Sequence, residues 1–393
     1  MSTPLSQNEA AAPETARVSV SVPLSDGVLA FGADLKNTVC TGIGSEALIY
    51  GPHGDLSQPE AYRSFLKTVA SLQETIEDDS CVIVHDLHPG YLSTIHAQRQ
   101  TQPKVSVQHH HAHAVSCAVD AHADLPVVGV VCDGTGFGTD GAIWGGEVLL
   151  CDDDSFRRMA HFDYFPLPGG DAAARDTWRP ALSLTRETLG QDCLSTAPAV
   201  FESVDSGELG LVAQQLGAGL NTTDTSSLGR LFDAVAFLAG VCNLNSYEGQ
   251  AGQELQAAAQ TVRDAEAYSF EVLARQDPAR IDWRNMIREI INERCAGVDA
   301  AIIAGRFHKT VVEMLESAAC AVATKTGVSR VVLSGGCFFN ALLRDGLSGR
   351  LTTRGLEVYM HQRVSPGDAG LSLGQARIGS AMASRRIGNT QGT

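Results

Sequence analysis

The chain alternates short, continuous apolar runs with longer segments in which apolar residues recur at helical spacing. Residues 28–33 and 81–84 are runs of the first kind, which is typical of strands that are buried on both faces. Residues 59–72 are a segment of the second kind and predict an amphipathic helix between two such strands. This order of strand, helix and strand predicts an α/β unit in which helices cover a sheet.

The same alternation continues through the rest of the chain. Residues 127–132 predict a buried strand that ends in Asp133-Gly134. Residues 331–333 predict another that ends in Ser334-Gly335-Gly336, with a helix beginning at Asn340. We therefore predict an α/β protein whose sheets are covered on both faces.

Length and local composition predict how the chain is divided. A chain of 393 residues suggests two or three compact units at roughly 150 residues each. Residues 1–22 are rich in Ala, Ser, Thr, Pro and Gln without a period, so we expect a disordered leader there. We expect an N-terminal lobe over residues 23–150 and a C-terminal lobe over residues 151–393, with the last helix a candidate to return to the first lobe.

Charge and hydropathy narrow the classes of partner. The chain has 29 basic and 45 acidic residues, a net charge of −16, and phosphate backbones need clustered Lys and Arg. We therefore expect no nucleic-acid partner. No apolar run reaches the roughly 20 residues that cross a bilayer, and no signal peptide is visible, so we expect a cytoplasmic protein without a membrane partner.

The densest chemical signal is the sequence Gln108-His109-His110-His111-Ala112-His113, which has four imidazoles in five residues. If this segment is helical, His109 and His113 lie four apart on one face, a spacing that suits a metal held by two histidines. The alternative is a solvated histidine cluster that binds metal only adventitiously.

Two glycine-rich turns follow predicted strands. The first runs from Cys132 to Gly141, where Asp133 at the strand end would lie beside backbone N–H groups that can meet an anion. Its alternative is a tight β-hairpin whose glycines only serve turns. The second, Ser334-Gly335-Gly336, would present N–H donors to a phosphate before a helix, and no Walker lysine follows it.

A third such turn, Pro366-Gly367-Asp368-Ala369-Gly370, precedes the closing helix, where an isolated Asp is most often a helix cap. Taken with the histidines, however, Asp133 and Asp368 complete a mixed nitrogen and oxygen donor set. Two imidazoles with one or two carboxylates suit iron(II) or zinc with open positions for a substrate.

These motifs also carry a resemblance to a known family. Over nearly all of residues 28 to 385 the chain resembles the C-terminal domain of the NiFe-hydrogenase maturation factor HypF. More distantly it is similar to O-carbamoyltransferases of antibiotic synthesis and to the threonylcarbamoyl transferase of tRNA modification. The matching stretches are Leu35–Thr38, His88-Pro89 with Tyr91, Val107–His113, Asp133–Gly141, Trp144–Glu147, Leu167–Asp171, Ser226–Asp233, Tyr247–Gln250, Ser334–Asn340 and Asp368–Gln375.

The resemblance implies a fold and a site. The fold is a two-lobed, actin-like ATPase fold with a nucleotide and metal cleft between the lobes. The implied catalytic residues are Asp133 and His110, of which His110 would contact the carbamoyl group. The metal, Fe2+ or Zn2+, would be held by His109, His113, Asp133 and Asp368. An ATP or AMP moiety would lie with its phosphates near Gly335, Gly336 and Asn340, and with its nucleoside near Gly229, Arg230, Asp233 and Glu248.

The chain departs from the family pattern in two ways. The family usually has Asn before Asp368 and Gly after it, and it has Pro where this chain has Thr177. In addition, the acylphosphatase, zinc-finger and YrdC-like domains of full-length relatives do not fit within the short leader.

The implied activity is carbamoyl transfer in hydrogenase maturation, from carbamoyl phosphate or carbamoyl adenylate to the C-terminal cysteine of HypE, towards the cyanide ligands of the NiFe centre. Hydrolysis of carbamoyl phosphate is the simpler outcome at the same site. The alternatives are a catalytically reduced docking module for HypE or a separate full-length HypF, and a small-molecule O-carbamoyltransferase.

Overall fold

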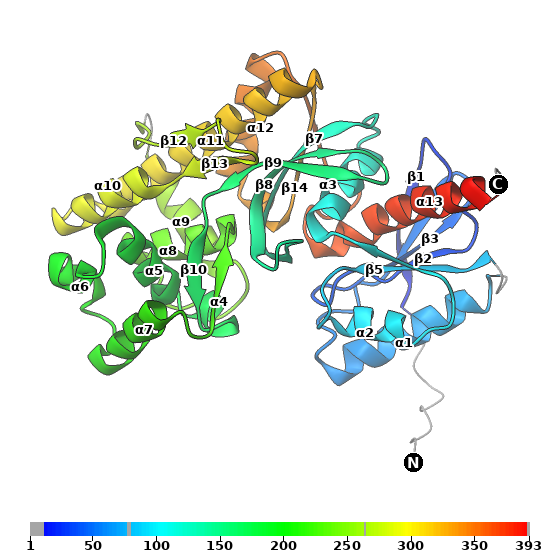
Figure 1. Cartoon of the computed structure of the whole chain (residues 1–393), viewed down its shortest axis with the longest axis horizontal. Helices are drawn as coiled ribbons and strands as arrows, with labels where there is room; N and C mark the ends of the chain where they lie inside the picture. Colours follow the sequence, from blue (N-terminus) through cyan, green and yellow to red (C-terminus); the bar gives the residue numbers. More distant parts are fainter. Residues whose placement is uncertain (1–11, 77–79, 263–264, 391–393) are drawn as a thin grey trace. The chain divides into compact units, whose positions relative to one another are not determined.

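A computed structural model describes residues 12–76, 80–262 and 265–390, with side chains up to residue 385 (Figure 1). The chain forms two compact units. The first comprises the chain up to Val127, the short segment Cys151–Phe156 and the chain from Tyr359 onwards. The second comprises Val128–Leu150 and Arg157–Val358. The first boundary therefore lies at the start of a strand, and not at residue 150 as expected.

Within the described residues, the first unit contains a six-stranded sheet of order β1-β4-β3-β2-β5-β6. The strands β2, β5 and β6 pair in parallel, and the other pairs are antiparallel. The elements are β1 Glu14–Ser19, β2 Val28–Ala30, β3 Val39–Ile43, β4 Glu46–Tyr50, β5 Val82–Asp86, β6 Lys104–Val107, α1 Pro59–Gln73, α2 Leu92–Gln98, α3 His109–Asp120, the short η4 Asp368–Gly370 and α13 Leu371–Thr390.

The strand β1 corrects the expected extent of the leader. It lies inside residues 1–22 and pairs antiparallel with β4, with Val18 opposite Ala47. Val18 is fully buried, and Arg17 forms ion pairs with Glu14 and Glu46. Pairing with β4 therefore makes a strand of a segment whose own sequence has no hydrophobic period. The expectation for residues 1–11 lies outside the described part of the chain.

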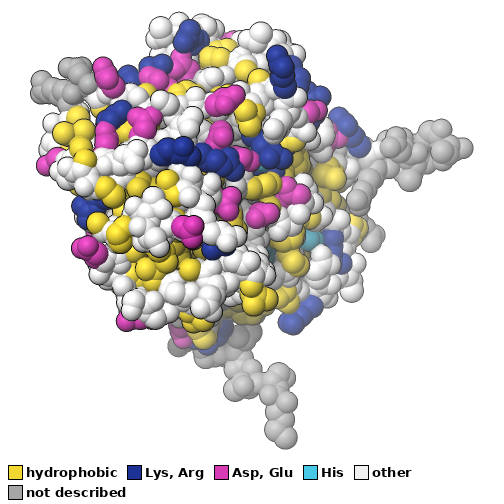
Figure 2. Space-filling model, turned by 60° about the vertical axis from the view of Figure 1, so that its left-hand side comes forward, with side chains coloured by type: hydrophobic (Ala, Val, Ile, Leu, Met, Phe, Trp, Pro, Cys, Tyr) yellow, Lys and Arg dark blue, Asp and Glu magenta, His cyan; other side chains and the backbone are white. Residues whose placement is uncertain are grey.

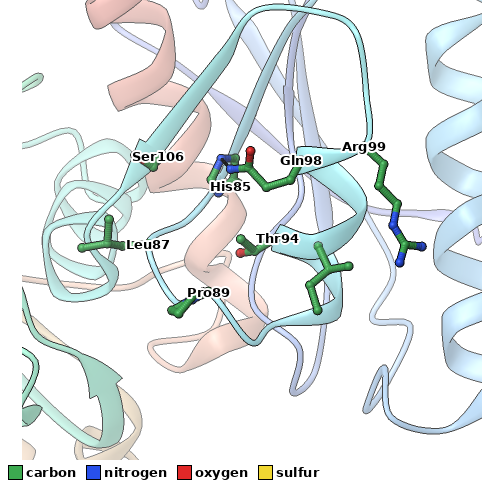
Figure 3. Close-up of a pocket in the computed structure, with 8 residues that line it drawn as sticks. His85, Leu87, Pro89, Thr94, Gln98, Arg99 and Ser106 are labelled. Carbon is green, nitrogen blue, oxygen red and sulfur yellow. Dashed lines mark hydrogen bonds between the residues drawn. The ribbon is translucent and has the colours of Figure 1, made fainter.

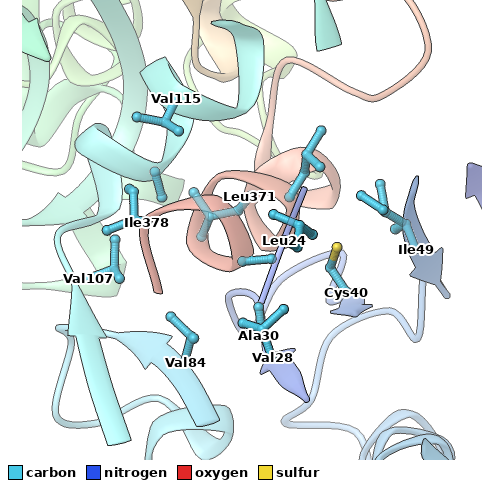
Figure 4. Close-up of a cluster of buried hydrophobic side chains, with 14 of the residues drawn as sticks. Leu24, Val28, Ala30, Cys40, Ile49, Val84, Val107, Val115, Leu371 and Ile378 are labelled. Atoms are coloured by element: carbon cyan, nitrogen blue, oxygen red, sulfur yellow. The ribbon is translucent and has the colours of Figure 1, made fainter. Parts of the chain in front are cut away.

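Helices cover both faces of this sheet, as the apolar runs predict. In β2, Val28 and Ala30 belong to a cluster with α3 and α13, whereas Leu29 belongs to a second cluster with α1 and α2. Successive side chains of a strand point to opposite faces, so a continuous apolar run fills both clusters. Figure 4 shows the first cluster, in which Val115 of α3 and Leu371 of α13 meet the strand residues.

Within the described residues, the second unit contains a nine-stranded sheet whose main path is β12-β13-β9-β8-β7-β14-β15, with β10 and β11 attached to β8. The strands are β7 Val127–Phe137, β8 Ile143–Cys151, β9 Phe156–Phe162, β10 Phe165–Pro168, β11 Thr222–Thr225, β12 Glu271–Leu273, β13 Ala279–Asp282, β14 Arg330–Ser334 and β15 Glu357–Met360. The helices are α4 Asp171–Arg175, α5 Trp178–Leu189, α6 Cys193–Thr196, η2 Pro198–Phe201, α7 Ser206–Ala218, α8 Leu228–Leu238, α9 Gln250–Ala259, α10 Arg284–Cys295, α11 Ala300–Thr326, η3 Gly336–Phe339 and α12 Ala341–Thr353.

The strand β7 is longer than the apolar run predicts. It continues through Asp133 to Phe137, so the carboxylate lies within the strand and not at its end. The reason is the hairpin to β8, which turns where the Gly138 N–H donates to the Ala142 carbonyl at 2.9 Å. The glycines at the tip serve this turn, as the hairpin alternative expected. Asp133 owes its surroundings to the parallel neighbour β14, in which Ser334 pairs with Val131.

In the described part of the chain, no helix combines the length and the apolar character that crossing a membrane would require. On the face shown in Figure 2, Lys and Arg side chains are interspersed with Asp and Glu side chains.

Candidate metal centre and phosphate loop

The helix α3 begins at the histidine cluster. The Gln108 side chain caps it by accepting the His111 N–H at 2.9 Å, so the helical register starts at His109. His109 and His113 therefore lie one turn apart on the same side, with ring centroids 4.8 Å from each other, and both are fully buried. Burial argues against a solvated histidine cluster, because imidazoles gain nothing from burial without polar partners.

Asp368 lies opposite these two rings. Its Oδ1 atom is 3.6 Å from His109 Nε2 and 3.6 Å from His113 Nε2. One candidate ligand atom from each of the three residues lies within 4.8 Å of the others. Two imidazole nitrogens and one carboxylate oxygen at these separations fit a small divalent cation such as Zn2+ or Fe2+, with room for further ligands.

A buried carboxylate that the sequence analysis missed stands behind His109. Asp86, the last residue of β5, places its Oδ2 atom 2.8 Å from His109 Nδ1, and both side chains are fully buried. An ionised carboxylate can only accept, so Nδ1 carries the proton and Nε2 presents a lone pair towards Asp368. Metal-binding histidines commonly have such a carboxylate partner. A carboxylate close behind a short apolar run in the sequence, as Asp133 is behind residues 127–132, was the signal that could have found it.

The opposite end of α3 holds the segment that carries Asp368. The Asp120 carboxylate accepts backbone N–H groups from Gln362, Arg363 and Val364 at 2.6 to 3.2 Å. Burial raises the pKa of Asp120, but hydrogen bonds from His361 and from these N–H groups outweigh it and leave the pKa lowered. Asp120 therefore fixes the approach of the loop to the two histidines.

Two further contacts fix the same loop on α3. The Ser116 hydroxyl donates to the Gly370 carbonyl at 2.7 Å. A Cβ atom at Gly374 of α13 would lie 1.9 Å from the Ala112 carbonyl oxygen, so this position needs glycine for the two helices to approach. The geometry around Asp368 is thus set by direct packing of α13 on α3.

His110, the residue expected to contact a carbamoyl group, is also fully buried. Its Nδ1 atom lies 3.2 Å from the amide nitrogen of Gln108. A donor amide at this distance makes Nδ1 an acceptor and leaves the proton on Nε2. His110 could therefore offer an N–H to a ligand oxygen, and its role in catalysis stays a prediction.

In the second unit, Asp133 is the centre of a group of backbone donors. Its Oδ1 atom accepts the Gly134 N–H at 2.8 Å and the Gly336 N–H at 3.2 Å. Gly335 has φ +101°, and a Cβ there would lie 2.2 Å from the Cys132 carbonyl oxygen. Only glycine allows β14 to turn this closely against β7. The predicted strand-to-glycine turn at Ser334 is thus confirmed in form.

The helix α8 joins this group at its N-terminus. Ser227 caps the helix and donates its hydroxyl to the Gly134 carbonyl at 2.6 Å. A Cβ at Gly229 would lie 2.8 Å from Gly134 Cα, so the first turn of the helix lies directly on the Asp133-Gly134 backbone. Helix N-termini favour anions, and this one lies on the residue whose carboxylate accepts the Gly336 N–H.

The remaining predicted nucleotide residues have different surroundings. Arg230 and Asp233 form an ion pair of 2.7 Å, Asn245 donates to Asp233 at 3.0 Å, and burial raises the pKa of Asp233. The Asn340 side chain caps α12 and lies 2.9 Å from His308 Nε2, so its amide serves the helix start. Glu248 is exposed in the turn before α9. The roles of these residues in nucleotide binding stay predictions.

A buried ionic network lies next to the start of α8. Glu147 is fully buried, and it accepts from Arg158 Nε at 2.6 Å and from the Ser226 hydroxyl at 2.5 Å. The Arg158 guanidinium lies 4.0 Å from the Trp144 ring centroid. The Trp144–Glu147 motif therefore holds the residue that precedes the cap of α8.

Comparison with known proteins places these features in a family. The model of the HypF Kae1-like domain matches residues 24–120, and the model described as carbamoyltransferase, Kae1-like domain, second subdomain, matches residues 129–375. Carbamoyltransferase HypF2 of Cupriavidus necator is 36% identical over 377 residues, which cover 89% of this chain and 46% of the relative. Carbamoyltransferase HypF of Rhizobium leguminosarum bv. viciae is 37% identical, covering 88% of this chain and 44% of the relative.

A shorter relative and two solved structures agree. The carbamoyltransferase HypF homolog of Cupriavidus necator is 37% identical over 364 residues, which cover 89% of this chain and 91% of the relative. Full-length HypF in a phosphate- and nucleotide-bound form superposes with a TM-score of 0.88 at 37% identity, covering 94% of this chain and 48% of that one. T. kodakarensis HypF gives 0.85 at 27% identity, covering 94% and 49%.

The chain thus spans about half the length of the two longer curated relatives and nearly all of the shorter one. The matched models and relatives cover both units, including the histidine cluster of α3 and the glycine turn after β14. The chain therefore belongs to the HypF family of carbamoyltransferases and corresponds to their Kae1-like C-terminal part.

Proposed function

We propose that this chain is a metal-dependent, carbamoyl-converting enzyme of hydrogenase maturation. In this proposal it transfers a carbamoyl group to the C-terminal cysteine of HypE, or hydrolyses carbamoyl phosphate at the same site. The observation that carries the proposal is the buried set of His109, His113 and Asp368, with the Asp86 carboxylate 2.8 Å behind His109. A docking module has no need for buried imidazoles that are aligned on a carboxylate, so catalysis is the better reading.

The chemistry follows from the donor set. Fe2+ or Zn2+ held by His109, His113 and Asp368, with Asp133 proposed as a further ligand, would act as a Lewis acid towards a carbamoyl or phosphoryl oxygen. His110 would donate an N–H to the carbamoyl group. The N–H groups of the Gly335-Gly336 turn would take up charge that develops on a phosphate. Carbamoyl phosphate is an activated mixed anhydride, so a Lewis-acid metal and N–H donors at one site could suffice for its cleavage.

We further propose the two-lobed, actin-like arrangement with an ATP or AMP moiety between the lobes. Support comes from the phosphate- and nucleotide-bound form of the related HypF structure. It also comes from the helix α8, whose first turn lies on the Asp133-Gly134 backbone and carries Arg230, the partner of Asp233 in an ion pair. The absence of a nucleic-acid partner remains an expectation from the charge of −16, and a cytoplasmic location remains an expectation from the hydropathy of the chain.

The test is release of phosphate and carbamate from carbamoyl phosphate by metal-analysed protein, with and without ATP and HypE. His113→Ala and Asp368→Ala should each lower bound metal and rate by at least roughly 10-fold. The matched control is His122→Ala, because His122 is an exposed histidine just beyond α3. Wild-type metal content and rate in both variants would show that the shared metal site is wrong. Loss of metal with unchanged hydrolysis would make the site structural.

A further inference from the structure

The first turn of the helix α8 presents backbone hydrogen-bond donors that the rest of the protein does not use. Ser227 caps the helix, and its hydroxyl oxygen accepts the Arg230 N–H at 3.0 Å. The N–H groups of Leu228 and Gly229 come before it, where an α-helix has no carbonyl of its own to offer. In the described part of the chain neither of these two N–H groups has an acceptor. The positive end of the α8 dipole therefore carries two available donors.

The Arg230 side chain adds a buried cation to these donors. The residue is 8% exposed, and its Nε atom lies 2.7 Å from Asp233 Oδ2. Asp233 is itself buried, and its Oδ1 atom accepts from the Asn245 amide at 3.0 Å. A guanidinium has five N–H groups, and this ion pair occupies the one at Nε. Among the described residues, no acceptor lies within hydrogen-bond distance of Arg230 Nη1 or Nη2. Asp233 therefore fixes the guanidinium and leaves its outer donors unused.

Both groups of donors meet at Gly134. A Cβ atom at Gly229 would lie 2.8 Å from Gly134 Cα, so the first turn of α8 lies on this residue. A Cβ atom at Gly134 would have Arg230 Nη2 as a neighbour at 3.9 Å, and no other atom of the described second unit within 4 Å outside its chain neighbours. The Gly134 N–H is already taken by the Asp133 carboxylate at 2.8 Å. Gly134 therefore borders an open space whose available donors come from Arg230 and from α8.

These donors match a phosphoryl group. Its oxygens accept several hydrogen bonds at once, and the planar guanidinium of arginine can bind it with two parallel N–H groups. Helix N-termini bind phosphates through the N–H groups of their first turn. A ribose or a base carries no charge, so it would not compensate the guanidinium and the helix dipole. The Arg230 charge also extends to the turn after β14, where burial and Asp133 raise the pKa of the Cys337 thiol and Arg230 opposes them.

The hollow between β5, α2 and β6 in the first unit has no comparable donors among its described lining residues (Figure 3). Its polar side chains bond to the protein itself. His85 Nε2 lies 3.0 Å from the Gln98 amide nitrogen, and the Thr94 hydroxyl donates to the Asp86 carbonyl at 3.0 Å. The Arg99 side chain points away from the other residues of the hollow. The start of α8 is therefore the better candidate for a bound anion.

We propose that Arg230 and the first N–H groups of α8 hold a phosphate of the bound nucleotide, and that Asp233 is a positioning residue for Arg230. The inference rests on the nucleotide of the proposed function. It assigns Gly229, Arg230 and Asp233 to the phosphate, in place of the nucleoside contact that the family resemblance implies. The open space at Gly134 lets phosphate oxygens approach the guanidinium and the helix together. AMP should therefore bind more tightly than adenosine, and inorganic phosphate should displace AMP.

The experiment measures the dissociation constants of AMP, adenosine and inorganic phosphate with the full chain by calorimetry. Arg230→Gln should weaken AMP and phosphate at least about 10-fold, because a charge-assisted hydrogen bond is lost, and should leave adenosine unchanged. Asp233→Asn should cause a smaller loss with the same preference for the charged ligands. Gly134→Ala should also weaken AMP and phosphate, because its methyl group would occupy the open space. This substitution causes no strain, since Gly134 has no positive φ and 3.9 Å is an ordinary van der Waals distance.

Two control variants match these substitutions, and thermal unfolding shows which variants fold. Arg354→Gln removes an exposed arginine that pairs with Glu316 at 2.8 Å, and Gly349→Ala adds a methyl group that meets no atom within 4 Å. Both should bind all three ligands as the wild type does. If the loss of a partner for buried Asp233 unfolds Arg230→Gln, Gly134→Ala carries the test.

The outcomes separate this inference from the proposed function. Equal loss of AMP and adenosine affinity in Arg230→Gln would assign Arg230 to the nucleoside and overturn the inference. Unchanged AMP affinity in folded Arg230→Gln or Gly134→Ala would overturn it as well. Loss of phosphate binding without loss of AMP binding would make the ligand a separate phosphate ion and overturn the nucleotide assignment. Absence of both AMP and adenosine binding to wild-type protein would instead refute the nucleotide of the proposed function.

Discussion

Replacing Asp86 with Asn should weaken metal binding without unfolding the protein. The Asp86 Oδ2 atom is 2.8 Å from His109 Nδ1, and its Oδ1 atom accepts the His88 N–H at 2.8 Å. The Asn side chain keeps an oxygen for His88 but turns an N–H towards His109. His109 must then become an acceptor at Nδ1 and carry its proton on Nε2. The nitrogen that faces Asp368 would thus be blocked for metal binding.

The size of this effect follows from the burial of the pair. Both side chains are 0% exposed, so in the Asn variant water cannot replace the carboxylate as the acceptor for a proton on His109 Nδ1. A hydrogen bond to a charged group contributes about 1.5–3 kcal/mol. Since about 1.4 kcal/mol corresponds to 10-fold, this predicts a loss of metal affinity on the order of 10- to 100-fold. The same range is typical of substitutions at groups that orient metal ligands.

The assay is calorimetric titration of Zn2+ or Co2+ into metal-free protein, with thermal unfolding of the metal-free forms recorded in parallel. Asp345→Asn, an exposed carboxylate on α12, serves as the control and should leave metal affinity unchanged. If Asp86→Asn binds metal as the wild type does while His113→Ala does not, the orientation of His109 does not depend on Asp86. The tautomer argument would then be refuted.

Three further substitutions test the packing that supports the two sites, each through the free energy of unfolding in urea. Gly374→Ala should destabilise by about 1–3 kcal/mol, because its Cβ would lie 1.9 Å from the Ala112 carbonyl oxygen. Asp120→Asn should cost about 1–3 kcal/mol at pH 7. The pKa of Asp120 is lowered in the folded state, so its ionised form stabilises the fold. The wild type should therefore have the larger free energy of unfolding above the unfolded-state pKa of about 3.9, and it should lose this difference as the pH falls through the folded-state pKa. Glu147→Gln should cost about 3–5 kcal/mol, and adding Arg158→Met should recover part of it.

Each of these has a control or an opposing outcome. Gly349→Ala in α12 meets no atom within 4 Å and should be neutral or stabilising. Equal unfolding free energies for Gly374→Ala and Gly349→Ala would contradict close packing of α13 on α3. An Asp120→Asn penalty that is the same at pH 3 as at pH 7 would mean that the carboxylate charge is not the stabilising feature. Additive costs for the Glu147 and Arg158 substitutions would show that the pair is not coupled.

The local elements could be predicted from sequence because each rests on short-range patterns. The apolar run at 28–33 contributes side chains to two clusters on opposite faces of the sheet. His109 and His113 lie on one face because the helix begins directly after the Gln108 cap. The glycine turn at Ser334 was likewise predictable, because two glycines directly follow a short apolar run. In each case the signal lies within about ten residues.

What could not be predicted depends on contacts between distant parts of the chain. The role of Asp86 depends on its hydrogen bond to His109, which follows β6 in the sequence. The role of Asp120 depends on its hydrogen bonds to residues 362–364. The strand β1 lacks a period of its own and is ordered by β4. The prediction ended the strand β7 too early. Its length is set by pairing with β14 and by the hairpin to β8, and not by the local hydropathy.

These long-range contacts converge on one helix. The first turns of α3 carry both candidate histidines, and its last residue, Asp120, binds the segment that leads to Asp368. Between these ends, Ser116 holds the Gly370 carbonyl at 2.7 Å. The separation between the imidazoles and the Asp368 carboxylate is therefore fixed by the length of α3 and by the loop that returns along it. A metal site built in this way is preorganised before metal binds, since Asp86 orients His109, and Asp120 and Ser116 hold the segment that carries Asp368, through hydrogen bonds that need no metal.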